Sequence, residues 1–271
     1  MIAQTASVVL RVSPFSSTSH IVTWLTPAYG RLSTVVKGAC RPKSQFLGQY
    51  DIFYTCELLY YKRERNGIHI AKACSPIQTR QELRSDWRAF AHASYMCGLI
   101  LRVSVPGGHH GEVFELAQTF LDHLCSRGAE PQVLFWFEQR LMGVLGMAPQ
   151  LGKCAACDAA IAERRTTTFS AARGGLLCST CSRGLPEQSI IKLPPDVRAI
   201  LARWQGADSP HIAAATRCSP RQLLVIRRVL GIFLTYHLDV TPQCRAIALD
   251  IARSTDGRKT STHDTLDRRR V

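Results

Sequence analysis

Apolar and β-branched residues in the first 75 positions of the chain occur in short runs separated by turn residues. The fourth run alternates, with Ile52, Tyr54, Cys56 and Leu58 on one side, and an Asn66-Gly67 pair precedes the fifth run. Alternation is the pattern of a half-buried strand, and Asn-Gly is a hairpin signal. The expected strands cover residues 6–12, 20–26, 30–36, 50–61 and 68–73. Five short strands in this length predict a small β-barrel of the OB type over residues 1–76.

From about residue 77 the apolar period becomes helical. Leu83, Trp87, Phe90 and Ala91 define the apolar face of a first helix that continues toward residue 103. The next helix has the clearest pattern, with apolar residues at spacings of three and four: Val113, Leu116, Ala117, Phe120, Leu121 and Leu124. Gly128 ends that helix, and Pro131 begins a third one that stops at Gly146. We therefore expect the first part of a helical domain over residues 77–150.

The second part of the helical domain is expected over residues 185–252. A short helix covers residues 196–204, and Ser219-Pro220 begins a longer helix with serine as the N-cap. Residues 253–271 are polar and rich in arginine near the end, so a disordered basic tail is predicted there. The fold class is thus α+β, with a five-stranded barrel followed by an α-helical domain.

Between the two helical parts, residues 151–184 contain two CxxC pairs, Cys154 with Cys157 and Cys178 with Cys181. Two such pairs at this separation suit one tetrahedral ion with four thiolate ligands, typical of one structural Zn²⁺ per chain. Four protein ligands leave no open position for chemistry. The alternatives are two redox dithiols or four unrelated buried cysteines. A redox CxxC usually follows a strand of a βαβ unit, whereas the first pair here follows a predicted helix.

Composition favours a polyanionic partner. The 271 residues carry 34 Lys and Arg against 20 Asp and Glu, a formal net charge of +14. This excess favours nucleic acid over a membrane surface. The start of the chain lacks the features of a signal peptide, no apolar stretch is long enough to span a bilayer, and the other seven cysteines are scattered singly. We expect a soluble cytoplasmic protein with no membrane partner.

The basic residues that stand out are Arg31, Lys37, Arg41 and Lys43, around the third strand and its exit. Lys62, Arg63 and Arg65 lie on the hairpin before the fifth strand. OB barrels bind single strands through a basic groove and aromatic stacking side chains. Candidates for stacking are Phe46, Tyr50 and Tyr29, each of which could equally be a core residue.

Catalytic motifs are missing from the sequence. There is no Walker A loop, GxSxG elbow, HExxH pair or EF-hand loop, so no enzyme is expected. His109-His110, within a glycine-rich stretch, could be half of a second metal site or simply a helix connection. Arg227 and Arg228 fit either nucleic acid or an acidic protein tail.

Several of these segments resemble the bacterial recombination mediator family RecO. The resemblance is carried by Tyr29-Gly30-Arg31-Leu32, by residues 36–39 and 41–44, by Gly67-Ile68-His69-Ile70, and by residues 137–149 running into the first CxxC pair. These segments occur in the family's order over roughly residues 5–250. The match in order is more specific than any one motif.

The resemblance implies a DNA-binding mediator of the RecF pathway. Such a protein binds single- and double-stranded DNA, anneals complementary strands and helps load RecA on DNA coated by single-strand-binding protein (SSB), in the nucleoid. The implied partners are RecR and the acidic C-terminal tail of SSB, with RecA acting indirectly. The DNA contacts carry over to Arg31, Lys37, Arg41 and Lys43, where the motif matches, and some members lack the cysteines.

Two rival functions remain at this point. A zinc-ribbon and OB-fold RNA-binding module would have the same basic barrel, and a preference for structured RNA would favour it. A metal-dependent nuclease or deaminase would need an open metal position, and the chain has no HxE followed by PCxxC.

Overall fold

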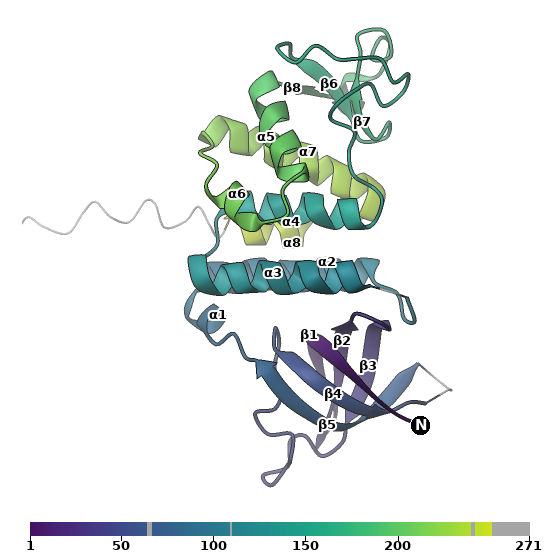
Figure 1. The fold of residues 1–271 in the computed structure, drawn as a ribbon, viewed down its shortest axis with the longest axis vertical. Helices are drawn as coiled ribbons and strands as arrows, with labels where there is room; N and C mark the ends of the chain where they lie inside the picture. The colour runs from purple at the N-terminus through teal and green to yellow at the C-terminus, as the bar shows by residue number, and fades with distance from the viewer. Residues whose placement is uncertain (64–66, 109, 240–241, 251–271) are drawn as a thin grey trace, which may run out of the picture.

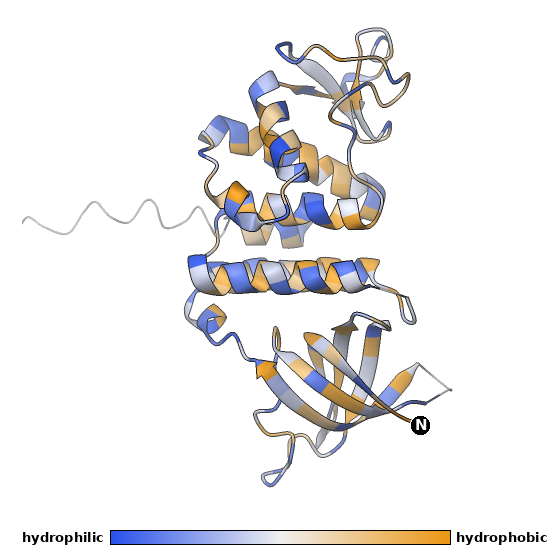
Figure 2. Ribbon diagram, in the orientation of Figure 1, coloured by the Kyte–Doolittle hydropathy of each residue, from blue (hydrophilic) through white to orange (hydrophobic). Residues whose placement is uncertain are grey.

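The chain folds into a β-barrel, a helical domain and a small three-stranded sheet, stacked in that order along the long axis (Figure 1). The structure is a computed structural model that describes residues 1–63, 67–108, 110–239 and 242–250. Figure 2 shows apolar and polar residues on each of the long helices and along the barrel strands, as expected for elements with one buried side. Among the described residues, none of the helices combines the length and the apolar composition that a span of the lipid bilayer requires.

The N-terminal barrel is closed by five strands in the order β1-β2-β3-β5-β4. The strands are β1 (Ile2–Ser16), β2 (Ser19–Thr26), β3 (Gly30–Val36), β4 (Thr55–Tyr61) and β5 (Ile68–Gln78). Neighbouring strands are antiparallel except β3 and β5, which run parallel. Trp24 lies in the barrel core, where its indole N–H donates to the Thr34 hydroxyl at 3.0 Å. The predicted five-stranded barrel followed by helices is confirmed.

The fourth strand begins later than predicted. Residues 50–54 belong to the connection between β3 and β4, and β4 starts only at Thr55. Phe53 adopts a φ of 72°, in the left-handed region, and its buried ring packs with the helical domain instead of the barrel. The apolar alternation of this segment therefore reflects two different cores.

The helical domain contains eight helices in the described ranges. They are α1 (Glu82–Ser85), α2 (Trp87–Val103), α3 (Gly111–Arg127), α4 (Pro131–Val144), α5 (Pro195–Gln205), α6 (Pro210–Ala214), α7 (Pro220–Leu238) and α8 (Pro242–Asp250). All six predicted core positions of α3 are buried. Ser219 caps α7 and forms a capping box with Gln222, as its sequence predicts.

The apolar face predicted for α2 is partly wrong. The predicted helix is divided at Asp86, and Leu83, which is fully buried, lies on α1. On α2, Trp87 is 45% exposed and Phe90 is 40% exposed. The buried side of α2 is formed instead by Ala89, His92, Ala93, Tyr95, Met96, Cys97, Leu99 and Ile100. The helix has apolar residues on two sides, and periodicity alone cannot say which side faces the core.

The barrel packs on the helices through an apolar seam and a buried arginine. Val8, Leu10 and Leu25 from the barrel belong to the same buried cluster as the helices. Arg80, after β5, is 4% exposed; its guanidinium donates to Asp122 on α3 and to the Phe53 carbonyl, both at 2.9 Å, and to the Thr55 hydroxyl at 2.8 Å.

A second contact joins the β2–β3 turn to the segment before α3. Gly30 has a φ of 59°, and a Cβ there would lie only 2.5 Å from the Val105 carbonyl. The backbone N–H of Arg31 donates to that carbonyl at 3.2 Å, and Gly107 donates to Tyr29 at 2.9 Å. Only glycine permits this close approach, which fixes the barrel against the end of α2.

The cysteine segment folds around a small sheet in the order β7-β6-β8. The strands are β6 (Thr167–Ser170), β7 (Gly175–Leu177) and β8 (Ile191–Leu193), with a 3₁₀ turn η1 (Glu187–Ser189) before β8. A turn at residues 171–174 joins β6 to β7. The limit of 184 for this module stays a prediction, and β8 beyond it completes the sheet.

Candidate metal centre and nucleic-acid interface

The four cysteines of the two CxxC pairs come together in space. Their Sγ atoms all lie within 4.8 Å of one another, and they are the only group of three or more potential metal ligands found among the described residues. Cys154 and Cys157 lie in the segment between α4 and β6, and Cys178 and Cys181 follow β7. The Cys157 and Cys178 sulfurs are 3.8 Å apart, too far for a disulfide and suited to two ligands of one ion. Four unrelated cysteines are thus ruled out.

Backbone N–H groups point at the sulfurs. Cys178 donates to the Cys154 sulfur and Cys181 donates to the Cys178 sulfur, both at 3.4 Å. The first pair lies on a tight turn in which Asp158, with a φ of 63°, donates its N–H to the Cys154 carbonyl at 2.9 Å. The N–H groups that donate to sulfur stabilise thiolates, the form in which cysteine binds metals.

The pKa values of the thiols shift in opposite directions within the cluster. Burial opposes ionisation of the Cys154 thiol. Backbone N–H groups, of which that of Cys178 has the largest effect, nevertheless lower its pKa to about 6. The neighbouring sulfurs of Cys157 and Cys178 raise the pKa of Cys181 to about 12. The sulfurs compete for negative charge, and a divalent cation removes this competition. The four cysteines can therefore hold one metal ion, with no ligand position left for a substrate.

Arg198 on α5 attaches the metal module to the helices. Its guanidinium is almost fully buried and donates to four carbonyls, those of Leu151, Gly152, Ile161 and Ala162, at 2.9 to 3.3 Å. Sequence reasoning missed this residue, because a single arginine in a helix carries no signal that it will bind backbone carbonyls elsewhere.

The four basic residues predicted to contact DNA are not in one place. Lys37, Arg41 and Lys43 are exposed on the connection that leaves β3, and none makes an ion pair with a described residue. Arg31 lies at the opposite end of β3. Six positions separate it from Lys37, which corresponds to about 20 Å of extended strand. We call the first three residues the basic loop.

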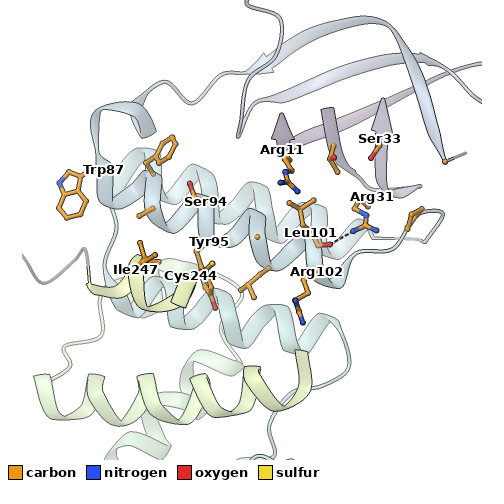
Figure 3. A pocket seen from close by; sticks show the side chains of 18 residues that line it. Arg11, Arg31, Ser33, Trp87, Ser94, Tyr95, Leu101, Arg102, Cys244 and Ile247 are labelled. Carbon is orange, nitrogen blue, oxygen red and sulfur yellow. Dashed lines mark hydrogen bonds between the residues drawn. The ribbon is translucent and has the colours of Figure 1, made fainter. Parts of the chain in front are cut away.

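Arg31 faces a groove between the barrel and the helices (Figure 3). Its Nη1 donates to the Leu101 carbonyl near the end of α2 at 2.8 Å. The groove has a volume of about 950 Å³ and separates the outer side of β1, β2 and β3 from α2 and α8.

Of the three candidate stacking residues, Tyr29 alone is well exposed, at 39%. Phe46 is buried in the barrel core. Tyr50 is half-buried, and its hydroxyl lies 2.8 Å from Nδ1 of His20. Burial, followed by the nearby Cys40 thiol, raises the pKa of Tyr50 to about 12. Phe46 and Tyr50 are therefore structural.

The remaining candidates are the two adjacent histidines, the basic residues of the hairpin and the two arginines of α7. His110 packs against Gly30 and Gly108, and no further metal ligands gather with it in the part of the chain that is described; His109 lies outside that part. Lys62 is exposed on the β4–β5 hairpin, whereas Arg65 lies outside the described residues. Arg227 forms a bidentate pair with Asp250, and Arg228 is exposed.

Both halves of the chain match a known protein family. The family model described as "Recombination protein O N terminal" matches residues 1–80, and "Recombination protein O C terminal" matches residues 84–243. The DNA repair protein RecO of Anaeromyxobacter dehalogenans strain 2CP-1 is 31% identical over 239 residues, covering 87% of this chain and 91% of that protein. The protein of the same name from Roseiflexus sp. strain RS-1 is 29% identical over 249 residues, covering 92% and 85%.

A third relative, the DNA repair protein RecO of Moorella thermoacetica, is 25% identical over 251 residues, which cover 92% of this chain and 91% of that protein. The two matched regions correspond to the barrel and to the helices with their cysteine module. The resemblance found in the sequence is confirmed, and the chain belongs to the RecO family of DNA repair proteins.

Proposed function

We propose that this protein is a DNA-binding recombination mediator of the RecF pathway. It binds single- and double-stranded DNA, anneals complementary strands and assists RecA loading on SSB-coated DNA at the nucleoid. The observation that carries the proposal is the family match over both halves of the chain, joined to a closed barrel whose connecting loop presents unpaired cations.

Annealing requires that the repulsion between two phosphate backbones be screened while the base edges stay free to pair. Lys37, Arg41 and Lys43 can contact phosphates without reading bases, and such contacts need no nucleotide hydrolysis. Arg31 is the fourth proposed DNA contact. A non-catalytic role follows from this mechanism.

The ion at Cys154, Cys157, Cys178 and Cys181 is proposed to be one structural Zn²⁺, because four sulfur ligands favour zinc over magnesium or calcium. The proposed partners are RecR and the acidic tail of SSB. A groove of about 830 Å³ between α7 and α8 supports contact with such a tail, since Arg228 lies beside the exposed apolar side chains of Leu224 and Tyr236.

The test is annealing of two complementary oligonucleotides by metal-quantified protein, without ATP and at two salt concentrations. We expect acceleration that weakens with salt, about one zinc per chain, and loss of most DNA binding in the Lys37→Glu, Arg41→Glu double variant. The matched control is Arg203→Glu with Arg217→Glu, an equal charge change at exposed positions of the helical domain.

Three outcomes count against the proposal. Tight DNA binding without acceleration would reduce the protein to a general nucleic-acid binder. A preference for structured RNA would favour the RNA-binding alternative. Unchanged binding by the folded loop variant would place the main DNA contacts outside the basic loop.

A further inference from the structure

The groove between the barrel and the helices is lined by cations from both sides. The described residues that line it include Arg11, Arg31 and Arg102 but no aspartate or glutamate. In Figure 3, these three arginines lie at one end of the groove, and Trp87 and Ile247 lie at the other. The groove therefore has a positive end and an apolar end.

The arginines on the barrel side have unused hydrogen-bond donors. Arg11 is exposed, extends from β1 toward α2, and makes no ion pair with a described residue. Arg31 uses Nη1 on the Leu101 carbonyl, which leaves other N–H groups of its guanidinium available. Arg102 differs, because it is paired with Asp239. Arg11 and Arg31 can thus donate hydrogen bonds to phosphate oxygens.

The apolar end exposes two aromatic rings on one helix. Trp87 and Phe90 stand on the groove side of α2, at 45% and 40% exposure, while Trp24, Trp136 and Trp204 are completely buried. Phe90 packs edge-on against the buried Phe53 ring, with the ring centroids 5.2 Å apart, and the rest of its ring and that of Trp87 stay open to the groove. The two exposed ring surfaces, one helical turn apart on α2, form an apolar surface on which bases can stack.

We propose that this groove binds a stretch of single-stranded DNA, with its phosphates on Arg11 and Arg31 and its bases against Trp87 and Phe90. Stacking on aromatic rings requires unpaired bases, which a duplex does not offer. The strand β2–β3 side of an OB barrel is also a surface that accommodates oligonucleotides. Trp87 and Leu101 are fourteen residues apart on α2, or about 21 Å, room for several nucleotides.

This inference rests on the proposed function but uses a surface separate from the basic loop. The basic loop screens the backbone at the far end of β3, whereas the groove would hold unpaired bases apart from the partner strand. The two surfaces can therefore be tested independently.

Tryptophan fluorescence reports on the groove directly, because Trp87 is the one exposed tryptophan of the four, all of which lie in described parts of the chain. The probe is an oligothymidylate of about 12 nucleotides, within the range that OB folds bind. Its binding is followed in parallel by anisotropy of a labelled copy, and comparison ligands are a duplex of the same length and polyglutamate.

We expect oligothymidylate to quench the fluorescence, and Trp87→Phe to remove the quenching while binding persists. Trp87→Ala with Phe90→Ala should weaken single-strand binding by about tenfold or more, since each stacked base contributes about 1 to 3 kcal/mol. Arg11→Glu should weaken binding and lower the slope of log K against log salt by about 0.7 per lost phosphate contact. Arg203→Glu, with the same charge change, is the matched control.

The outcomes separate the two proposals. If the protein binds oligothymidylate by anisotropy without quenching, and Arg11→Glu binds like the Arg203→Glu control, the groove is not the site although the proposed function stands. Quenching by polyglutamate but not by oligothymidylate would assign the groove to an acidic polypeptide and overturn the inference. No anisotropy change with any DNA would overturn both.

Discussion

His92 on α2 is a buried histidine whose environment makes stability depend on pH. It is fully buried, and burial lowers its pKa to about 4 from an ordinary value of 6.5, against weaker opposite effects of the Ala248 backbone and of Asp86. Between these two pH values the unfolded chain binds a proton that the folded protein does not bind. This histidine therefore favours unfolding as the pH falls below about 6.5.

We predict that His92→Leu reduces the acid sensitivity of the protein. Between pH 7 and pH 5, the free energy of unfolding should fall by about 2 kcal/mol less in the variant than in the unchanged protein. Urea unfolding at the two pH values measures this difference. An equal fall in both proteins would mean that the His92 imidazole becomes protonated in the folded state.

The metal cluster gives a second prediction for a single residue. Cys157→Ser removes one of the four sulfurs, so we expect loss of the bound zinc and a lower melting temperature. Atomic absorption and thermal unfolding provide the readouts. Cys244→Ser is the control, since Cys244 is exposed and lies outside the cluster. One zinc per chain and unchanged melting in Cys157→Ser would contradict the four-sulfur site.

Among the elements, α4 and α8 are joined by a buried ion pair. Arg245 donates to both carboxylate oxygens of Glu138, at 2.6 and 2.8 Å, and Tyr95 on α2 donates to the same carboxylate at 2.8 Å. Glu138 is 0% exposed and Arg245 is 6% exposed. Removal of one partner from such a pair leaves an uncompensated buried charge.

Glu138→Leu is therefore predicted to destabilise the protein by about 3 to 5 kcal/mol. Replacing both partners, as Glu138→Leu with Arg245→Met, should recover much of this loss, because no buried charge then remains. Chemical unfolding of the two variants tests the expectation. A double variant that is less stable than Glu138→Leu would show that packing of the arginine, and not its charge, dominates.

Element types followed from local patterns, whereas the contacts between elements did not. The five barrel strands, the spacing in α3 and the Ser219 cap follow from local patterns, and the structure confirms them, although the fourth strand begins five residues later than its alternation predicted. The CxxC spacing similarly predicted the cluster, because a tight turn fixes each pair. The exposed rings of Trp87 and Phe90 were assigned to the core, since α2 is apolar on two sides and only tertiary packing selects one.

The burial of two arginines could also not be predicted from the sequence. Arg80 and Arg198 are each stabilised by groups distant in the chain, and nothing in their neighbouring residues distinguishes them from surface arginines. The four predicted DNA contacts fell on two surfaces, because Arg31 lies at the start of β3 and the other three lie on the connection after its end. Which of them contact DNA stays a prediction.

At the scale of the whole molecule, the barrel and the helices are held together by an apolar seam and by polar contacts beside it. Arg80 is central among them, since its guanidinium reaches α3, the Phe53 carbonyl, Thr55 and, at 2.8 Å, Gln78. Each hydrogen bond to a charged group contributes about 1.5 to 3 kcal/mol.

We predict that Arg80→Lys loosens the junction between the barrel and the helices, because a lysine cannot reproduce the several directed donors of the guanidinium. The free energy of unfolding should fall by about 2 to 4 kcal/mol. Amide exchange should accelerate at the start of β4 and the end of β5, while the barrel interior and the metal module keep their protection. The control is Arg84→Lys, which changes an exposed ion pair with Asp51. The free energy of unfolding of this variant should fall by less than about 1 kcal/mol. Uniform acceleration over the whole chain in Arg80→Lys would instead mean that barrel and helices unfold as one cooperative unit, with Arg80 stabilising that unit rather than the junction alone.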